Sequence, residues 1–277
     1  MTRDCGMRFT TRGNILYRIR GGLRTAVCND GRELFSVLSS YDGCNDDGKR
    51  VMMKMVKYLK AMSDEHPYKF GIAFMVIYLT WFVLLGVVDL QVVWYIECPL
   101  DQYIPFVKYM VVPYCMWFVW LAESLLHMAA RESAEVRWRT WAPMFSGMLL
   151  CLLFCTLVPN AIDLRPDEVQ GNDIFAMIVR LIEGVDDPKS VCPSLHVYST
   201  VMMDMGVHRA EGYRHAWVRP AARVLDILIC CATVMLKQHS IVDVFWALVL
   251  AFALDFLAEY LINHRTPMQY IRASRAQ

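Results

Sequence analysis

The sequence has few charged residues for its length, and its cysteines lack the spacing of a metal site. Charged residues make up 20% of its 277 positions, whereas about a quarter is usual in soluble domains. The ten cysteines include no CxxC pair and no Cys/His metal spacing, and five lie inside apolar runs. We therefore expect no cofactor, no metal and no disulfide framework. Whether Cys98 and Cys192 form a disulfide stays an open question.

Two long stretches of the sequence contain no charged residue. They are residues 70–88 and 140–162, which are 19 and 23 positions long. Each is long enough to cross a hydrocarbon core of about 30 Å as a helix. A buried helix in a soluble core could explain one such run, but two runs flanked by Trp and Tyr predict an integral membrane protein. The charged residues 1–24 lack the apolar core of a secretory signal, so we expect no signal peptide.

Four weaker apolar segments carry charged residues, namely 104–130, 195–207, 221–236 and 241–262. Because hydropathy alone does not identify them, the basic residues provide the cross-check. With six spans and the N-terminus inside, 23 of the 28 Lys and Arg residues fall on the inner face. The outer face then holds Lys108, Arg165, Arg180, Lys189 and Lys237. This bias predicts an all-α, polytopic six-transmembrane-helix bundle in the cell membrane, with both termini cytoplasmic.

Some of the weaker spans contain acidic residues. Asp204, Asp226, Asp255 and Glu259 all lie toward the cytosolic ends of their segments. Ionisable groups are costly within membrane helices and generally face a bundle interior or water. We therefore expect these four at the inner interface or in interhelical hydrogen bonds.

Residues 1–68 are expected to form a small cytosolic region, followed by a transmembrane domain at 69–277. A helix over residues 49–62 would have basic residues on one face and Met52, Met55, Val56, Leu59 and Met62 on the other. Such a helix is typical of one that lies on an anionic inner leaflet, although packing on the loops of the bundle fits equally well. A further short helix is expected at 31–41.

Three polar clusters reach the outer face in this topology. The third span runs into Arg165, the fourth begins at Pro193-Ser194-Leu195-His196, and Lys237-Gln238-His239 joins the last two. His239 and Asp243 are four residues apart, so on a helix their side chains share one face. A structural hydrogen bond is the alternative for this pair, and a merely interfacial position is the alternative for His196.

Together, the clusters match what phosphoryl transfer needs. A carboxylate at one ring nitrogen of His239 fixes the tautomer and leaves the other nitrogen free to attack phosphorus. His196 could protonate the leaving oxygen. The charge on the phosphoryl oxygens requires fixed donors. We expect catalytic roles for His239, His196 and Asp243, and phosphate binding by Arg165, Lys237 and Ser194.

These residues resemble the membrane branch of the type 2 phosphatidic acid phosphatase superfamily. Its motifs are Lys-x6-Arg-Pro, Pro-Ser-Gly-His and Ser-Arg-x5-His-x3-Asp. The first corresponds to Val158 and Arg165-Pro166, the second to Pro193-Ser194-Leu195-His196, and the third to Ala232-Thr233, His239 and Asp243. The resemblance covers about residues 70–262. It implies a six-helix core with His239 as the nucleophile that forms a phosphohistidine, Asp243 as its orienting group and His196 as the acid.

The departures from these motifs leave three functions open. Val158 and Thr233 stand where the family has cations, and Lys237 is a partial replacement by position. The pattern is similar to the sub-branch of inositol phosphorylceramide and sphingomyelin synthases. The chain could be a metal-independent lipid-phosphate phosphatase, a phosphotransferase that moves a lipid phosphoryl head group to an alcohol, or a non-catalytic membrane scaffold.

The expected partners are a membrane and a lipid phosphate or pyrophosphate, with no nucleic acid; the oligomeric state stays open. The segment 163–192 should cover the site and help to decide the acceptor. It carries seven acidic residues against three basic ones. An acidic segment of this kind disfavours binding of a free polyanion and is better suited to binding a polyol.

Overall fold

The structure is a computed structural model that describes residues 7–9, 14–19, 22–27, 46–88, 90–213 and 215–273. The chain forms two compact units, Met1–Ala61 and Met62–Gln277. The described part is mostly helical, with eight α-helices, in agreement with the expected helical class. The division expected at residue 68, between a cytosolic region and a transmembrane domain, stays a prediction.

The first unit contains an antiparallel sheet that the all-α expectation did not include. Its strands are β1 (Met7–Phe9), β2 (Asn14–Ile19) and β3 (Gly22–Val27). β2 pairs with both of its neighbours. Ile, Tyr, Thr and Val in these strands favour extended backbone, a short-range signal that hydropathy does not register. The helix expected at 31–41 lies outside the described residues, whereas the one expected at 49–62 is confirmed within α2 (Asp46–Glu65).

Four helices in the described part are long and apolar enough to cross a membrane. They are α3 (Pro67–Val87), α4 (Val111–Arg131, with the preceding turn), α5 (Ala134–Leu157) and the first part of α9 (Ile241–Ala273). The other two predicted spans are helical as well, α7 (Leu195–Arg209) and α8 (Val218–Met235). However, α7 has 15 residues, and α8 has three charged residues in its first half. The arrangement of six spans therefore stays a prediction.

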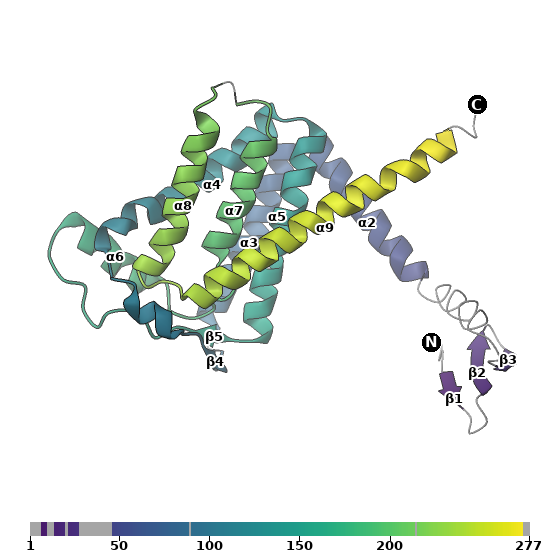
Figure 1. Cartoon of the computed structure of the whole chain (residues 1–277), viewed down its shortest axis with the longest axis horizontal. Helices are drawn as coiled ribbons and strands as arrows, with labels where there is room; N and C mark the ends of the chain where they lie inside the picture. The colour runs from purple at the N-terminus through teal and green to yellow at the C-terminus, as the bar shows by residue number, and fades with distance from the viewer. Residues whose placement is uncertain are drawn as a thin grey trace. The chain divides into compact units, whose positions relative to one another are not determined.

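Helix α7 forms the centre of the second unit. It packs against α4, α5, α8 and α9, and Figure 1 shows it between α8 and α5. Two glycines allow the close approach of neighbouring helices. A Cβ atom on Gly147 would lie 1.9 Å from the Tyr198 hydroxyl, and one on Gly206 would lie 2.5 Å from Thr140 Cγ2. Small residues at helix contacts serve this purpose in membrane proteins.

Two of the predicted spans have different ends in the structure. Helix α5 ends at Leu157 instead of 162, because Pro159 has no N–H and forces Val158 out of helical geometry. The next residues form β5 (Asn160–Ala161), which pairs in parallel with β4 (Trp94–Tyr95). Helix α4 begins at Val111 instead of 104 and follows two 3-10 turns, η2 (Pro99–Tyr103) and η3 (Lys108–Met110).

The segment 163–192 contains a helix that was not expected, α6 (Ile174–Val185). Asp173 caps its start by accepting the backbone N–H groups of Phe175 and Ala176 at 3.1 and 3.2 Å. An ion pair between Lys108 and Asp173 joins this cap to η3. The segment therefore has regular secondary structure and is not only a loop that covers the site.

Three of the four acidic residues named for the weaker spans form interhelical ion pairs, in line with the expectation. Asp204 accepts from Arg223 at 2.7 Å, and Asp255 accepts two hydrogen bonds from Arg209 at 2.6 and 2.7 Å. Glu259 lies within 3.7 Å of the guanidinium groups of α5 and α7. Asp226 differs, because both of its buried carboxyl oxygens have no hydrogen-bond partner in the described structure.

Candidate active site

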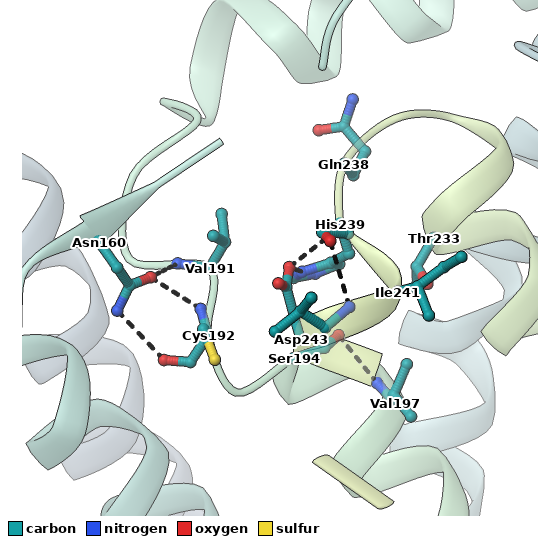
Figure 2. Close-up of polar contacts among 12 residues, drawn as sticks. Asn160, Val191, Cys192, Ser194, Val197, Thr233, Gln238, His239, Ile241 and Asp243 are labelled. Atoms are coloured by element: carbon teal, nitrogen blue, oxygen red, sulfur yellow. Dashed lines mark hydrogen bonds and ion pairs between the residues drawn. The ribbon is translucent and has the colours of Figure 1, made fainter. Parts of the chain in front are cut away.

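Connecting segments that are far apart in sequence meet at one end of the second unit. The strand after α3 joins the segment after α5, with Ile96 donating to the Ala161 carbonyl at 2.8 Å. The segment before α7 joins them, since Ile162 donates to the Pro188 carbonyl at 3.0 Å. Asn160 holds this last segment through one side-chain oxygen, which accepts the N–H groups of Val191 and Cys192, both at 2.9 Å. Figure 2 shows the contacts of Asn160 with Val191 and Cys192.

The turn between α8 and α9 has a fixed backbone geometry. Lys237 has a φ of 56°, the left-handed conformation that commonly ends a helix. The N–H groups of Gln238 and His239 both donate to the Thr233 carbonyl, at 3.0 and 3.1 Å. Thr233 stands in the third motif where the resembled family has arginine. Here its backbone helps to hold the candidate nucleophile.

His239 and Asp243 form a buried pair. His239 Nδ1 lies 3.0 Å from Asp243 Oδ2, and the same oxygen accepts the N–H of Ser240 at 3.0 Å. The two residues are 7% and 0% exposed, and Figure 2 shows the ring and the carboxylate facing each other. A carboxylate at this position favours the tautomer with the proton on Nδ1. The lone pair of Nε2 is then available to attack an electrophile.

His196 lies close to this pair in an aromatic setting. Its ring centroid is 5.8 Å from that of His239, 4.6 Å from Tyr114 and 4.3 Å from Trp117. Trp117 is held in turn by a hydrogen bond of 2.9 Å from its indole N–H to Ser199. His196 Nε2 is buried and has no hydrogen-bond partner in the described structure. An unpaired buried nitrogen is costly, and its position beside the pair suits a proton donor or acceptor for a ligand.

Ser194 is the N-cap of α7. Its hydroxyl accepts the N–H of Val197 at 3.3 Å, and its own N–H points at the Asp243 carbonyl from 3.4 Å. The residue is fully buried. The structure therefore brings Ser194 next to the pair and uses its side chain to start the helix that carries His196.

Arg165 also reaches this cluster. One terminal nitrogen, Nη1, donates to the carbonyls of Glu183 and Asp186 at 3.5 and 2.7 Å. The other, Nη2, donates to Gln238 Oε1 at 2.6 Å. Its guanidinium therefore ties the end of α6 to the residue that precedes His239. Burial raises the pKa of the Asp186 carboxyl, while the charges of Arg165 and His239 oppose this rise.

Lys237 is directed to a backbone group instead of open solvent. Its ammonium donates to the Asp101 carbonyl at 2.5 Å. The Asp101 carboxylate is buried and accepts from Ser240 Oγ at 2.6 Å, from the Ile241 N–H at 2.9 Å and from the Cys98 N–H at 2.8 Å. Asp101 thereby caps α9, and Lys237 braces the turn that leads into it.

Two residues of this site were missed by sequence reasoning. Asp101 and Asn160 are isolated polar residues beside apolar segments, and neither belongs to a motif. Each accepts backbone N–H groups that are distant in sequence, and Asp101 is 140 positions from Ile241. The one available signal was an Asp two residues after Pro99, a position typical of a turn.

Cys98 and Cys192 are free thiols in the structure. The disulfide left open between them is therefore not formed. Burial raises the pKa of the Cys192 thiol to about 12, so it stays protonated and unreactive near neutral pH. Within the described residues, no group of three or more His, Cys, Asp or Glu side chains could hold a metal ion.

Comparisons with known proteins add no family to these observations. Models of known protein families and the sequences of curated proteins give no match to this chain. The chemistry of the site therefore rests on its residues: a histidine held by a carboxylate, a second histidine beside it, and an arginine that binds the residue before the first histidine.

Proposed function

We propose that the chain is a metal-independent phosphatase of lipid phosphates that works through a phosphohistidine. The observation that carries the proposal is the His239–Asp243 pair with the unpaired His196 Nε2 beside it. His239 Nε2 attacks phosphorus, and the bond from phosphorus to the leaving oxygen breaks. His196 gives its proton to that oxygen, and water then hydrolyses the P–N bond. Membership of the type 2 phosphatidic acid phosphatase superfamily is part of this proposal.

Arg165 would stabilise the charge on the phosphoryl oxygens. In the structure its Nη2 is satisfied by the amide oxygen of Gln238 at 2.6 Å. We propose that a phosphate oxygen replaces this neutral acceptor, because an anionic oxygen attracts the guanidinium charge and can pair with it in a bidentate geometry. Ser194 contributes through the start of α7, where backbone N–H groups favour an anion. Lys237 acts mainly through its contact with Asp101.

The proposed topology has six spans, both termini in the cytoplasm and the site on the outer face of the cell membrane. The four long apolar helices support the membrane location. The ion pairs of α7, α8 and α9 lie away from the catalytic end of these helices, which supports a polar inner interface. The basic helix α2 would then rest on the inner leaflet.

Transfer of the phosphoryl head group to an alcohol is the second candidate. Two carboxyl groups lie near Arg165 at the end of α6, and burial raises the pKa of both Glu183 and Asp186. Such groups could accept hydrogen bonds from an acceptor hydroxyl. A non-catalytic scaffold is the third, because both Arg165 and Lys237 have protein partners in the structure.

One assay separates the three candidate functions. The purified full chain is given phosphatidic acid or a polyprenyl pyrophosphate in detergent with a metal chelator, and free phosphate is measured. We expect release by the wild-type chain and none by His239→Ala, with an acid-labile, alkali-stable phosphoryl label on the wild-type chain only. In an exchange, the lipid alcohol leaves and the phosphoryl group passes from His239 to the added alcohol. Parallel reactions with glycerol or inositol are therefore analysed by mass spectrometry for glycerol phosphate or inositol phosphate.

The outcomes are distinct. Exchange without phosphate release would replace the phosphatase by the transferase. Release that persists in His239→Ala would overturn the site assignment. If neither release nor exchange occurs in the wild-type chain, only the scaffold remains.

A further inference from the structure

Helix α6 has two opposite apolar faces. One face packs against the start of α4 and against η3. Ala176 and Val179 on this face are fully buried in a cluster with Val111 and Tyr114. The ring of Phe175 meets that of Tyr109 edge to face, with centroids 5.1 Å apart. This face anchors α6 on the bundle.

The other face is directed away from the protein. Four large apolar side chains follow each other at spacings of three and four residues, Ile174, Met177, Leu181 and Val185. Their exposed fractions are 59%, 55%, 66% and 82%. At 3.6 residues per turn these positions form one stripe, opposite Ala176 and Val179. A continuous row of exposed apolar side chains marks a surface that binds an apolar partner.

The place of α6 in the fold indicates which partner this is. Helix α4 has 21 residues and, at about 1.5 Å per residue, a length of about 31 Å, close to the thickness of a hydrocarbon core. Helix α6 packs against the first turn of α4. It therefore lies at the level where α4, as a candidate span, leaves the hydrocarbon core. Tyr109 of η3 and Val112 in the first turn of α4 are also exposed, at 59% and 50%. The apolar surface of the candidate span continues toward α6.

We propose that α6 is an interfacial helix whose stripe of Ile174, Met177, Leu181 and Val185 inserts among the acyl chains of one leaflet. An amphipathic helix in this position lies in the plane of the membrane, with its apolar face at the boundary between head groups and chains. The charged side chains of the helix are compatible with this placement. Arg180 is turned to the carbonyls of Val169 and Gly171, both at 2.9 Å, and Glu183 is half-buried.

Insertion of α6 would also set the depth of the site. Arg165 binds the carbonyls at the end of α6 and the side chain of Gln238, next to His239. A helix held at head-group level thus holds the histidines at the level of a lipid phosphate. This consequence rests on the proposed function, whereas the insertion itself does not.

Photo-crosslinking tests the insertion directly. The full chain, with p-benzoylphenylalanine at Leu181, is placed in phosphatidylcholine nanodiscs, irradiated and analysed by intact mass spectrometry. The matched control carries the same group at Glu168, an exposed position of the same segment, and Val76 of α3, exposed by 58%, is the positive control. We expect the yield of lipid adducts at 181 to exceed that at 168 by about fivefold or more and to approach that at 76.

Two results would overturn the proposal. One is a lipid yield at 181 no higher than at 168 while position 76 reacts normally. The other is a crosslinked dimer at 181, which would assign the stripe to a second copy of the chain. Neither result depends on phosphate release, so failure of the proposed function and failure of this inference are distinguishable.

Discussion

Asp243 Oδ2 accepts hydrogen bonds from two neighbours at once, 3.0 Å from His239 Nδ1 and 3.0 Å from the Ser240 N–H. The carboxylate is fully buried, so it is held by these contacts and not by solvent. A buried carboxylate of this kind fixes both the orientation and the tautomer of an imidazole. The His239–Asp243 pair is therefore a preorganised unit with one free ring nitrogen.

Asp243→Asn should nearly abolish phosphate release. The amide keeps the size of the side chain but removes the negative charge beside the ring. Where its NH2 group takes the position of Oδ2, it donates to His239 Nδ1 and cannot accept the Ser240 N–H, so the wrong tautomer becomes favoured. In a serine protease triad the same exchange lowers kcat by about 10⁴, and we expect a loss of at least about 10² here. The measurement is kcat on phosphatidic acid, with circular dichroism to verify folding. A folded variant with wild-type kcat would remove Asp243 from the mechanism.

Gln238→Glu should weaken substrate binding more than it slows the chemical step. The new carboxylate would form an ion pair with Arg165 at the position of the present 2.6 Å hydrogen bond. A phosphate would then have to displace a charged competitor, and we expect KM to rise by about tenfold or more. Gln238→Ala is the control, because it frees Arg165 and should not raise KM. Equal KM values in both variants would show that Arg165 does not bind the phosphate.

Asp101→Asn should lower both stability and kcat. The carboxylate accepts three hydrogen bonds at the start of α9, and an amide leaves at least one buried N–H unpaired. The expected cost is about 1–3 kcal/mol, measured as a lower unfolding midpoint in detergent. Ser240→Ala removes only one contact and should cost less. If Asp101→Asn unfolds at the wild-type midpoint, the cap contributes nothing measurable.

Gly147→Ala should disturb the packing of α5 on α7. The added methyl would meet the Tyr198 hydroxyl at 1.9 Å, and Tyr198 cannot simply withdraw because it donates to the Pro143 carbonyl at 2.7 Å. We expect a loss of about 1–3 kcal/mol, seen as a lower midpoint. Gly86→Ala on α3 is the matched control, since its added methyl meets nothing within 4 Å. Equal midpoints for the two variants would contradict this contact.

Stability should fall as pH rises because of Asp186. Burial raises the pKa of this carboxyl, so the folded chain holds the proton more tightly than the unfolded chain. This contribution is fully present below the unfolded-state pKa of about 3.9 and is lost as pH rises through the folded-state pKa. Asp186→Asn stays neutral, and its unfolding midpoint should fall less between about pH 4 and pH 7. If the unfolding midpoints of Asp186→Asn and of the wild-type chain change with pH in parallel, this effect is excluded.

The helical elements were largely predictable, because hydropathy and charge are local properties. The segments expected at 70–88, 195–207 and 221–236 correspond to α3, α7 and α8, with ends that differ by a few residues. The predicted ends failed where proline acts on its neighbours, as at Val158. Helix α6 was missed because it is only 12 residues long and lies in a segment that carries seven acidic residues.

The sequence by itself determined the helical character, the two charge-free runs and the spacing of His239 and Asp243, because each depends on residues within a few turns of one another. Only the tertiary structure decided what the cations do. Arg165 reaches Gln238 across 73 positions and Lys237 reaches Asp101 across 136. Such contacts depend on how connecting segments fold back over the ends of the helices, and no local pattern encodes that path. For the same reason, Asp101 and Asn160 became visible as supports of the site only once those segments were placed side by side.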